Sequence, residues 1–256
     1  MKNDKLNLKD FLTDILENPG KIHECFRYFK NYSLKNQALA SMQLYPKIEP
    51  INTYKGWQDL GRQVKKGAKA IQLMMPVQIK DDESDDPKAK KTIFIYKKNW
   101  FKLSDTDGEA FKEVETVVEN FDFKKCLENL KIEQIEFSDI NGNCQGYAIP
   151  KKQKIAISKL AANPLKTGLH EVAHCLLHSE EALLGDSLEL SKSIKEFEAE
   201  GVAYIVSTRL NLGGLEYSRG YIQDWLKYGS AKEITDKNFN RILTACDKIL
   251  KAGKID

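Results

Sequence analysis

Residues 170–174 read His-Glu-Val-Ala-His, and no other segment constrains the chain as strongly. The chain has four histidines, and three of them, His170, His174 and His178, fall within nine positions. On a helix, residues four apart share one face, so His170 and His174 can direct two imidazoles at one cation. Two neutral imidazoles suit zinc, which still needs a third protein ligand and an open position for water. Glu171 is then placed to take a proton from that water as it attacks a carbonyl.

The pentad is expected on a helix over residues 164–179. Asn163 can cap this helix, and Pro164 suits its first turn. An apolar stripe flanks the histidines and makes the helix amphipathic; it consists of Leu165, Leu169, Val172 and Leu176. The alternative is a surface helix with incidental histidines, but so few histidines rarely cluster without a function.

The third ligand is expected on the next helix, which carries three glutamates. Glu196 and Glu200 share one helical face with Ala199 and Ala203, and the two small alanines let this helix approach the first closely. Glu196 is ranked first as the ligand, and Glu200, one turn on, can accept a hydrogen bond from the second nitrogen of a ligand histidine. Glu200 and Glu198 remain the alternatives for the third ligand.

His178 lies too far along the helix to bind the same metal, and it is expected to form a polar helix end. His23 stands alone and is expected to be structural or solvated. The five cysteines form no Cys-x-x-Cys pair, which favours free thiols in a reducing compartment.

Composition excludes a membrane protein and favours the cytoplasm. No apolar run approaches the roughly 18 residues that span a bilayer. The first ten residues, MKNDKLNLKD, lack the apolar core of a secretory signal. The formal net charge of +3 conceals an asymmetry, because residues 21–80 hold eleven Lys or Arg against three acidic residues.

This basic region carries residues suited to single-stranded nucleic acid, which is held by cations on phosphates and aromatic rings on bases. The alternative is a solvated basic face with core aromatics. Tyr54 and Trp57 interleave with the cations, and Tyr96 and Trp100 lie on a later strand. The cations are Lys55, Arg62, Lys65, Lys66 and Lys69.

The pattern predicts two domains, residues 1–106 and 107–256, divided by the polar segment 104–110. The first domain is expected to hold helices over 7–17, 21–30 and 33–44, and a hairpin of strands 70–79 and 92–103 around the charged loop 81–91. The second is expected to hold helices over 111–130, 164–179, 192–210 and 235–252, and strands over 132–137 and 145–157. The 145–157 segment is expected to line a cleft and pair with an extended peptide.

The second half resembles zincin-type metallopeptidase domains, most closely those of ArdC-type antirestriction proteins, with the ImmA/IrrE group as cousins. The resemblance rests on Tyr147, Pro150, Ile155, the 170–174 pentad, and Glu196-x-x-Ala199-Glu200. It implies a zincin fold, and the analogy with gluzincins supports Glu196 as a zinc ligand. The segment 217–225 also resembles ArdC-like proteins, where Tyr221 is a candidate oxyanion partner.

The basic half resembles the single-stranded-DNA-binding N-terminal domain of the ArdC family. The matching residues are Asn31-Tyr32-Ser33-x-x-Asn36-Gln37 and Trp57-x-x-Leu60-Gly61-Arg62-x-Val64-Lys65-Lys66-Gly67-x-Lys69-x-Ile71. The resemblance implies DNA contacts by Asn36, Lys55, Trp57, Arg62, Lys65, Lys66 and Lys69. It also implies an antirestriction role on a mobile element such as a plasmid, during conjugation.

We therefore expect an α+β fold, with N-terminal helices and a β-hairpin or small sheet followed by a zincin-like metallopeptidase domain. The expected function is a zinc metallopeptidase that single-stranded DNA brings to an unidentified protein substrate. The alternative is a non-enzymatic protein that binds and protects single-stranded DNA and whose zincin domain is structural. A regulator of duplex DNA is disfavoured, since no helix-turn-helix signature accompanies the basic cluster.

Overall fold

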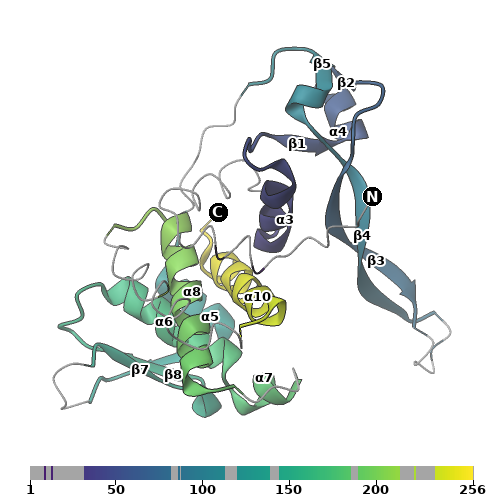
Figure 1. Cartoon of the computed structure of the whole chain (residues 1–256). Coiled ribbons are helices and arrows are strands. Elements are labelled where there is room, and N and C mark those ends of the chain that lie inside the picture. The colour runs from purple at the N-terminus through teal and green to yellow at the C-terminus, as the bar shows by residue number, and fades with distance from the viewer. Residues whose placement is uncertain are drawn as a thin grey trace. The chain divides into compact units, whose positions relative to one another are not determined.

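The computed structural model describes residues 9, 13, 32–81, 86, 88–112, 120–138, 144–185, 190–213, 222 and 234–255. The chain divides into two compact units (Figure 1): Cys25–Glu115, here called the N-terminal unit, and Met1–Glu24 with Thr116–Asp256, here called the C-terminal unit. Both units combine helices with small sheets, so the expected α+β class is confirmed. None of the described helices is both long and apolar enough to cross a membrane.

The N-terminal unit contains a three-stranded antiparallel sheet in the order β1-β4-β3 and a separate two-stranded sheet of β2 and β5. The expected hairpin is β3 and β4, and the expected helix 33–44 is α3. Its elements are α3 (Leu34–Leu44), β1 (Ile51–Thr53), α4 (Tyr54–Asp59), β2 (Arg62–Val64), β3 (Ile71–Lys80), β4 (Lys90–Lys102), the 3₁₀ turn η1 (Leu103–Asp105) and β5 (Thr106–Gly108).

The polar segment 104–110 is not a linker. Thr106 pairs with Val64, and Gly108 pairs with Arg62, so this segment supplies β5 to the N-terminal unit. The units divide after Glu115, whereas the sequence placed the boundary after residue 106. A three-residue strand carries too little alternation to be distinguished from a polar loop.

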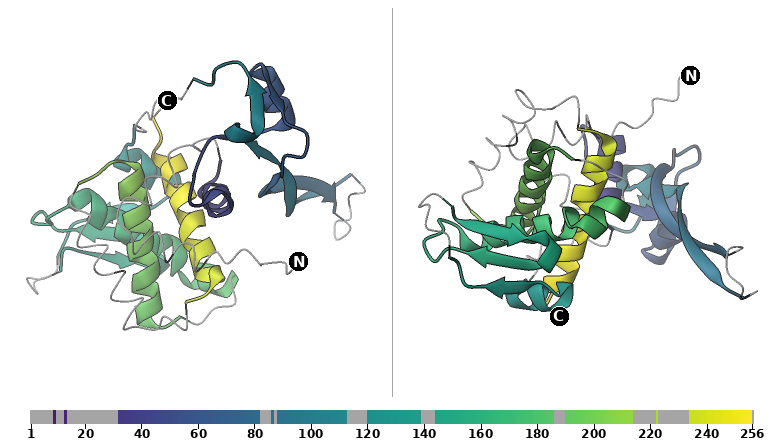
Figure 2. Two further views of the ribbon diagram at one scale, coloured as in Figure 1. Left: turned by 45° about the horizontal axis from the view of Figure 1, so that its top comes forward. Right: turned by 90° about the horizontal axis from the view of Figure 1, so that it is seen from below.

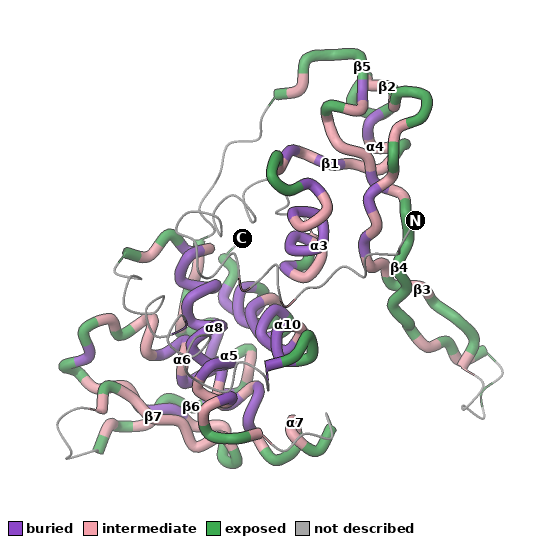
Figure 3. Tube along the Cα trace, in the orientation of Figure 1, coloured by how far each residue is buried: buried purple, intermediate pink, exposed green. Residues whose placement is uncertain are grey.

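The hairpin of β3 and β4 is buried at one end and exposed at the other (Figure 3). At the buried end, Ile71 pairs with Trp100, and a register irregularity follows directly after Ile71. The core there packs α3 against the sheet, because the apolar face of α3 and the inner ends of both strands supply large side chains. Its buried members are Leu39, Ala40, Leu44, Ile51, Ile71, Leu73 and Trp100.

Two amide side chains of α3 hold the outer edge of β3. Asn36 donates to the Met74 carbonyl (2.8 Å) and accepts from the Met74 N–H (2.9 Å). Gln43 makes the same pair of bonds with Gln72, at 2.8 and 2.9 Å. A strand edge exposes unpaired backbone groups, and here two side chains replace a neighbouring strand. Asn36 is therefore used within the fold.

The C-terminal unit contains a three-stranded sheet in the order β6-β8-β7, with β6 parallel and β7 antiparallel to β8. Helix α6 packs on β7 and β8, α8 packs on α6, and α10 packs on α8 and α5. Figure 2 shows α8 in green beside α10 in yellow. The elements are α5 (Phe123–Leu130), β6 (Glu133–Ile135), β7 (Gly146–Ile149), the 3₁₀ turn η2 (Pro150–Lys152), β8 (Lys154–Ile157), α6 (Pro164–Leu177), α7 (Glu180–Gly185), α8 (Lys192–Arg209) and α10 (Asp236–Gly253).

The helix expected over 111–130 is confirmed only from Phe123 onward, and its residues 113–119 lie outside the described residues. Residues 111–112 and 120–122 are not helical, and α5 begins only at Phe123. Asp122 caps α5 by accepting a hydrogen bond from the Lys125 N–H (3.0 Å), so the helix starts where a side chain satisfies its first free donors. The helices expected over 7–17 and 21–30 fall outside the described residues, except for Lys9 and Thr13, which are helical.

We predict that Asn36→Ala destabilises the N-terminal unit by about 1–3 kcal/mol, because the Met74 backbone groups lose both partners in a partly buried site. Urea denaturation measures this loss, and hydrogen exchange at the Met74 amide reports it locally. The exposed Gln58 of α4 provides the control, since Gln58→Ala should change neither. An unchanged exchange rate in the Asn36 variant would exclude the edge-holding role.

Candidate metal centre

Helix α6 presents His170 and His174 on one face. Asn163 accepts from the Lys166 N–H (3.1 Å) and Pro164 occupies the first turn, as the sequence indicates. The buried Leu169, Val172 and Ala173 fix the opposite face of this helix. The two imidazole Nε2 atoms lie 3.1 Å apart.

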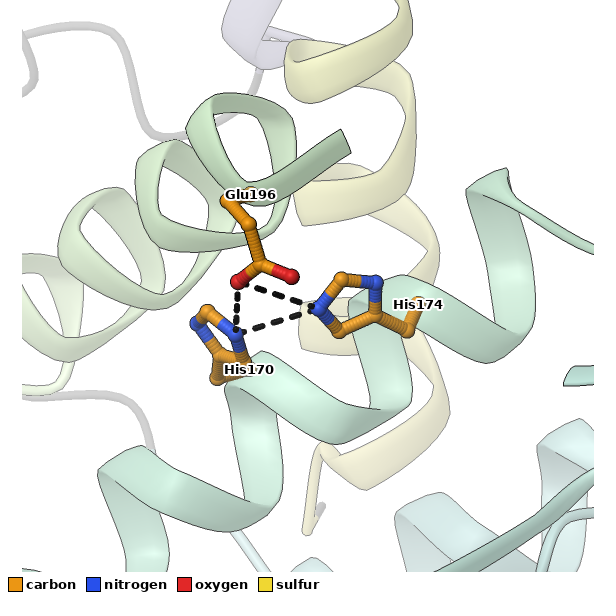
Figure 4. Close-up of side chains that lie close together, drawn as sticks. All are labelled: His170, His174 and Glu196. Carbon is orange, nitrogen blue, oxygen red and sulfur yellow. Dashed lines mark hydrogen bonds and ion pairs between the residues drawn. The ribbon is translucent and has the colours of Figure 1, made fainter. Parts of the chain in front are cut away.

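Glu196 of α8 completes a three-residue cluster (Figure 4). Its Oε2 lies 3.5 Å from His170 Nε2 and 3.7 Å from His174 Nε2. Zinc bonds of about 2.0–2.2 Å at tetrahedral angles would separate neighbouring ligand atoms by about 3.3–3.6 Å. The two nitrogens and one oxygen therefore fit a single divalent cation, with a fourth position left over.

Small side chains bring α8 this close to α6. Ala199 and Ala203 are fully buried, in keeping with the close approach that their spacing suggested. Hydrogen bonds with His170 and His174 lower the pKa of Glu196, so its carboxylate is ionised and ready to act as a ligand.

Glu200, one turn beyond Glu196, supports His170 from behind. Its Oε2 lies 3.0 Å from His170 Nδ1, and its Oε1 lies 2.8 Å from Lys166 Nζ. Burial acts to raise the pKa of Glu200, but His170 and Lys166 outweigh it and lower this pKa to about 2. Burial acts to lower the pKa of His170, but Glu196 and Glu200 outweigh it and raise that pKa to about 9. An ionised Glu200 thus holds Nδ1–H and turns Nε2 towards the cluster.

His178 is more than the polar helix end that the sequence predicted, and Glu198 bonds to it rather than joining the metal cluster as the alternative third ligand. His178 does end α6, but it is buried, and its Nδ1 lies 2.9 Å from His174 Nδ1. Its Nε2 lies 2.9 Å from Oε2 of Glu198, which is fully buried and far from being a solvated charge. The signal that was missed is the four-residue spacing from His174 to His178, which puts His178 on the same helical face as His170 and His174.

Glu171 is buried beside the cluster and faces strand β7. Burial raises the pKa of this carboxyl group, while His170 and His174 act in the opposite direction. A β-carbon placed on Gly146 would lie 3.2 Å from Glu171 Oε1 and 2.7 Å from Thr167 Cγ2. Only a residue without a side chain lets β7 approach the carboxylate so closely.

Two of the expected DNA contacts are structural in the N-terminal unit. Trp57 is only 1% exposed and donates from Nε1 to the Phe101 carbonyl (2.8 Å), so it cannot stack on a base. The Arg62 guanidinium donates to Thr106 Oγ1 (2.8 Å) and to the Thr106 carbonyl (3.0 Å), which ties β2 to β5. Like Asn36, these two residues are used within the fold of the unit.

The expected lysines lie at the surface. Lys65 donates to the Ser104 carbonyl (3.1 Å) and pairs with Asp107 (3.2 Å). Lys55, Lys66 and Lys69 are exposed, and none of them forms an ion pair with another described residue.

Sequence reasoning passed over the most exposed aromatic ring of the hairpin. Phe94 and Tyr96 of β4 are 64% and 54% exposed, and as alternate residues they lie on the same face as Lys98. Trp100, which was grouped with Tyr96, is buried in the core. The signal that was missed is the spacing of two within residues 92–98, which puts the two rings and Lys98 on one face of the strand.

The chain is similar to proteins of known family and structure. Residues 17–120 match the family described as the N-terminal domain of the anti-restriction factor ArdC. Crystal structures of the antirestriction protein ArdC from plasmid R388 share the fold, with a TM-score of 0.54 at 18% identity. The N-terminal part of this chain therefore carries an ArdC-type domain. The N-terminal match supports the relationship, and the fold of the chain is the ArdC fold.

Both structures of R388 ArdC align with this chain along nearly their whole length. The metal-free ArdC structure matches 97% of this chain and 95% of that chain, and the Mn(II)-bound ArdC structure matches 96% of each. An uncharacterized protein of Bacillus anthracis, pXO2-81, is 26% identical over 84% of this chain. The match covers 44% of that protein, so this chain spans less than half of its length.

Proposed function

We propose that this ArdC-type protein is a zinc-dependent metallopeptidase of an antirestriction system, and that its N-terminal unit binds single-stranded DNA. The observation that carries the enzymatic part is the cluster of His170, His174 and Glu196 with Glu171 beside it. A divalent metal is further supported by the Mn(II) in the R388 structure. Two imidazoles and one carboxylate suit zinc, although Mn²⁺ or Co²⁺ can occupy such a set in vitro.

Each protein group has a distinct task in the proposed reaction. When bound, the divalent cation supplies Lewis-acid chemistry and acidifies water. Glu171 accepts a proton from the attacking water and delivers it to the departing amine. Its burial suits this task, because a raised pKa brings a carboxylate closer to the range in which it exchanges protons near neutral pH.

The proposed substrate is an extended segment of a protein. Among the described strands, β7 pairs only with β8 and so lies at the edge of its sheet. An edge strand can bind an extended peptide through backbone hydrogen bonds. Because Gly146 of β7 lies against Glu171, a peptide on this edge would pass beside the proposed base.

We predict that Glu171→Gln abolishes peptide cleavage and leaves metal binding intact, because the amide keeps the shape of the side chain but cannot accept the proton. The test uses zinc-loaded protein with a mixed peptide library read by mass spectrometry, with and without a single-stranded oligonucleotide. Glu133→Gln, on the exposed surface of β6, is the matched control and should cleave as the wild type does.

Two results would contradict the enzymatic proposal. One is cleavage by the Glu171→Gln variant at the wild-type rate. The other is a loaded wild-type protein that cleaves nothing in the library, while the chain still binds and protects single-stranded DNA. The second result would favour the alternative, in which the zincin unit is structural.

The exposed face of β4 supports the DNA-binding part of the proposal. Phe94 and Tyr96 lie about 7 Å apart along the strand by its geometry, so neighbouring bases of an extended strand can stack on them. Lys98 lies on the same face, and the exposed Lys90 is close to the loop. Lys55, Lys66 and Lys69 are proposed to contact phosphates elsewhere on this unit.

We predict that Phe94→Ser and Tyr96→Ser each weaken binding of a fluorescent oligothymidine about 5- to 150-fold, because a stacked base contributes about 1–3 kcal/mol. Fluorescence anisotropy measures the affinity. Ile93→Ser and Ile95→Ser remove exposed apolar groups from the opposite face of β4 and serve as controls. Equal losses in both pairs would exclude the aromatic face as the stacking surface.

A further inference from the structure

A buried chain of polar side chains runs from His174 away from the metal centre. His174 Nδ1 contacts His178 Nδ1 (2.9 Å), and His178 Nε2 contacts Glu198 Oε2 (2.9 Å). The chain ends on helix α10, where Asn238 Nδ2 and Arg241 Nε lie 2.9 and 3.1 Å from Glu198 Oε1. It therefore links three helices.

Beyond His174, every group in this chain is removed from water. His178, Glu198, Asn238 and Arg241 are all buried, and a buried charge is costly unless it is paired and hydrogen-bonded. Glu198 meets this condition on both oxygens, and Arg241 also donates to the Leu177 carbonyl at the end of α6. Burial raises the pKa of Glu198 to about 7. Its Oε1 nevertheless accepts from Asn238 Nδ2 and from the permanently charged Arg241 guanidinium, and these donors favour the carboxylate form, which acts only as an acceptor.

The direction of the hydrogen bonds follows from that acceptor. His178 must donate from Nε2–H to Glu198, and a neutral imidazole with its proton on Nε2 has a bare Nδ1. That bare Nδ1 must accept from His174 Nδ1–H. His174 then has its lone pair on Nε2, the atom that lies 3.7 Å from the Glu196 carboxylate and 3.1 Å from His170 Nε2.

We propose that His178 and Glu198 are positioning residues that fix the tautomer and orientation of His174 for metal binding. Arg241 and Asn238 hold Glu198 in the required state and place. His170 receives the corresponding support directly from Glu200. All three glutamates of α8 therefore serve one centre: Glu196 as a ligand, Glu200 behind one histidine, and Glu198 behind the other through His178. This assignment rests on the proposed metal function.

Three variants separate positioning from packing. His178→Leu removes the acceptor for His174 Nδ1–H, and we expect zinc affinity to fall about 10- to 100-fold. His178→Asn places an amide oxygen near the former Nδ1, and we expect it to recover most of that loss. Glu200→Gln keeps an acceptor for His170 and is expected to lose less affinity than His178→Leu. Competition with a chelating fluorophore measures the affinity, and thermal unfolding in chelator shows whether each variant is folded.

Nuclear magnetic resonance of the wild-type protein tests the proposal without any variant. In metal-free protein labelled with ¹⁵N-histidine, the expected spectrum shows His174 protonated on Nδ1 and bare on Nε2, and zinc should shift the Nε2 resonance. A proton on His174 Nε2 would mean that the chain runs in the reverse direction, and it would overturn the proposal. So would zinc affinity in His178→Leu equal to that of the wild type.

If the proposed metal function is wrong, the experiments give a different result from the one expected if only the positioning role is wrong. A wild-type protein that binds neither Zn²⁺ nor Mn²⁺ would refute that function, whatever the variants do. The tautomer of His174 in the metal-free protein still decides whether His178 and Glu198 orient this ring.

Discussion

The close packing of α8 against α6 is the interaction on which the candidate centre depends. Ala199 and Ala203 are fully buried at this contact, so the glutamate side chains of α8 can reach the histidines of α6. A larger residue at either position would separate the helices, and Glu196 would no longer lie within 3.5–3.7 Å of the two imidazole nitrogens. Helix α10 supports the same arrangement from the far side of α8, because Arg241 bonds to both Glu198 and the end of α6.

Local spacing was enough to indicate the centre of this site. Four-residue steps placed His170 with His174, and Glu196 with Glu200, and the structure brings these side chains together. The chain behind His174 was not predictable, because Arg241 is distant in sequence and nothing local shows that α10 packs on α8. The sequence left Glu198 open as an alternative ligand, whereas in the structure its buried carboxylate bonds to His178 and Arg241. The long hairpin and main helices were predictable, whereas β1, β2 and β5 are too short to show a period.

The N-terminal unit shows a different limit of sequence reasoning. Asn36, Trp57 and Arg62 match the pattern of the ArdC N-terminal domain, and all three are used inside the unit, at a strand edge, in the core and between β2 and β5. Residues that identify a domain need not be those that touch its ligand, because a shared fold also requires shared internal contacts. The groups left at the surface are the lysines and the aromatic face of β4.

The central claim is that His170, His174 and Glu196 together bind one divalent metal ion. Its most direct test is the metal content per chain, measured by mass spectrometry on protein purified without chelator or metal-affinity resin and then equilibrated with Zn²⁺. We expect close to one zinc ion in the wild type and almost none in His174→Ala or Glu196→Ala, with Glu181→Ala on α7 matching the wild type. Stoichiometric zinc in both ligand variants, or none in the wild type, would contradict the claim.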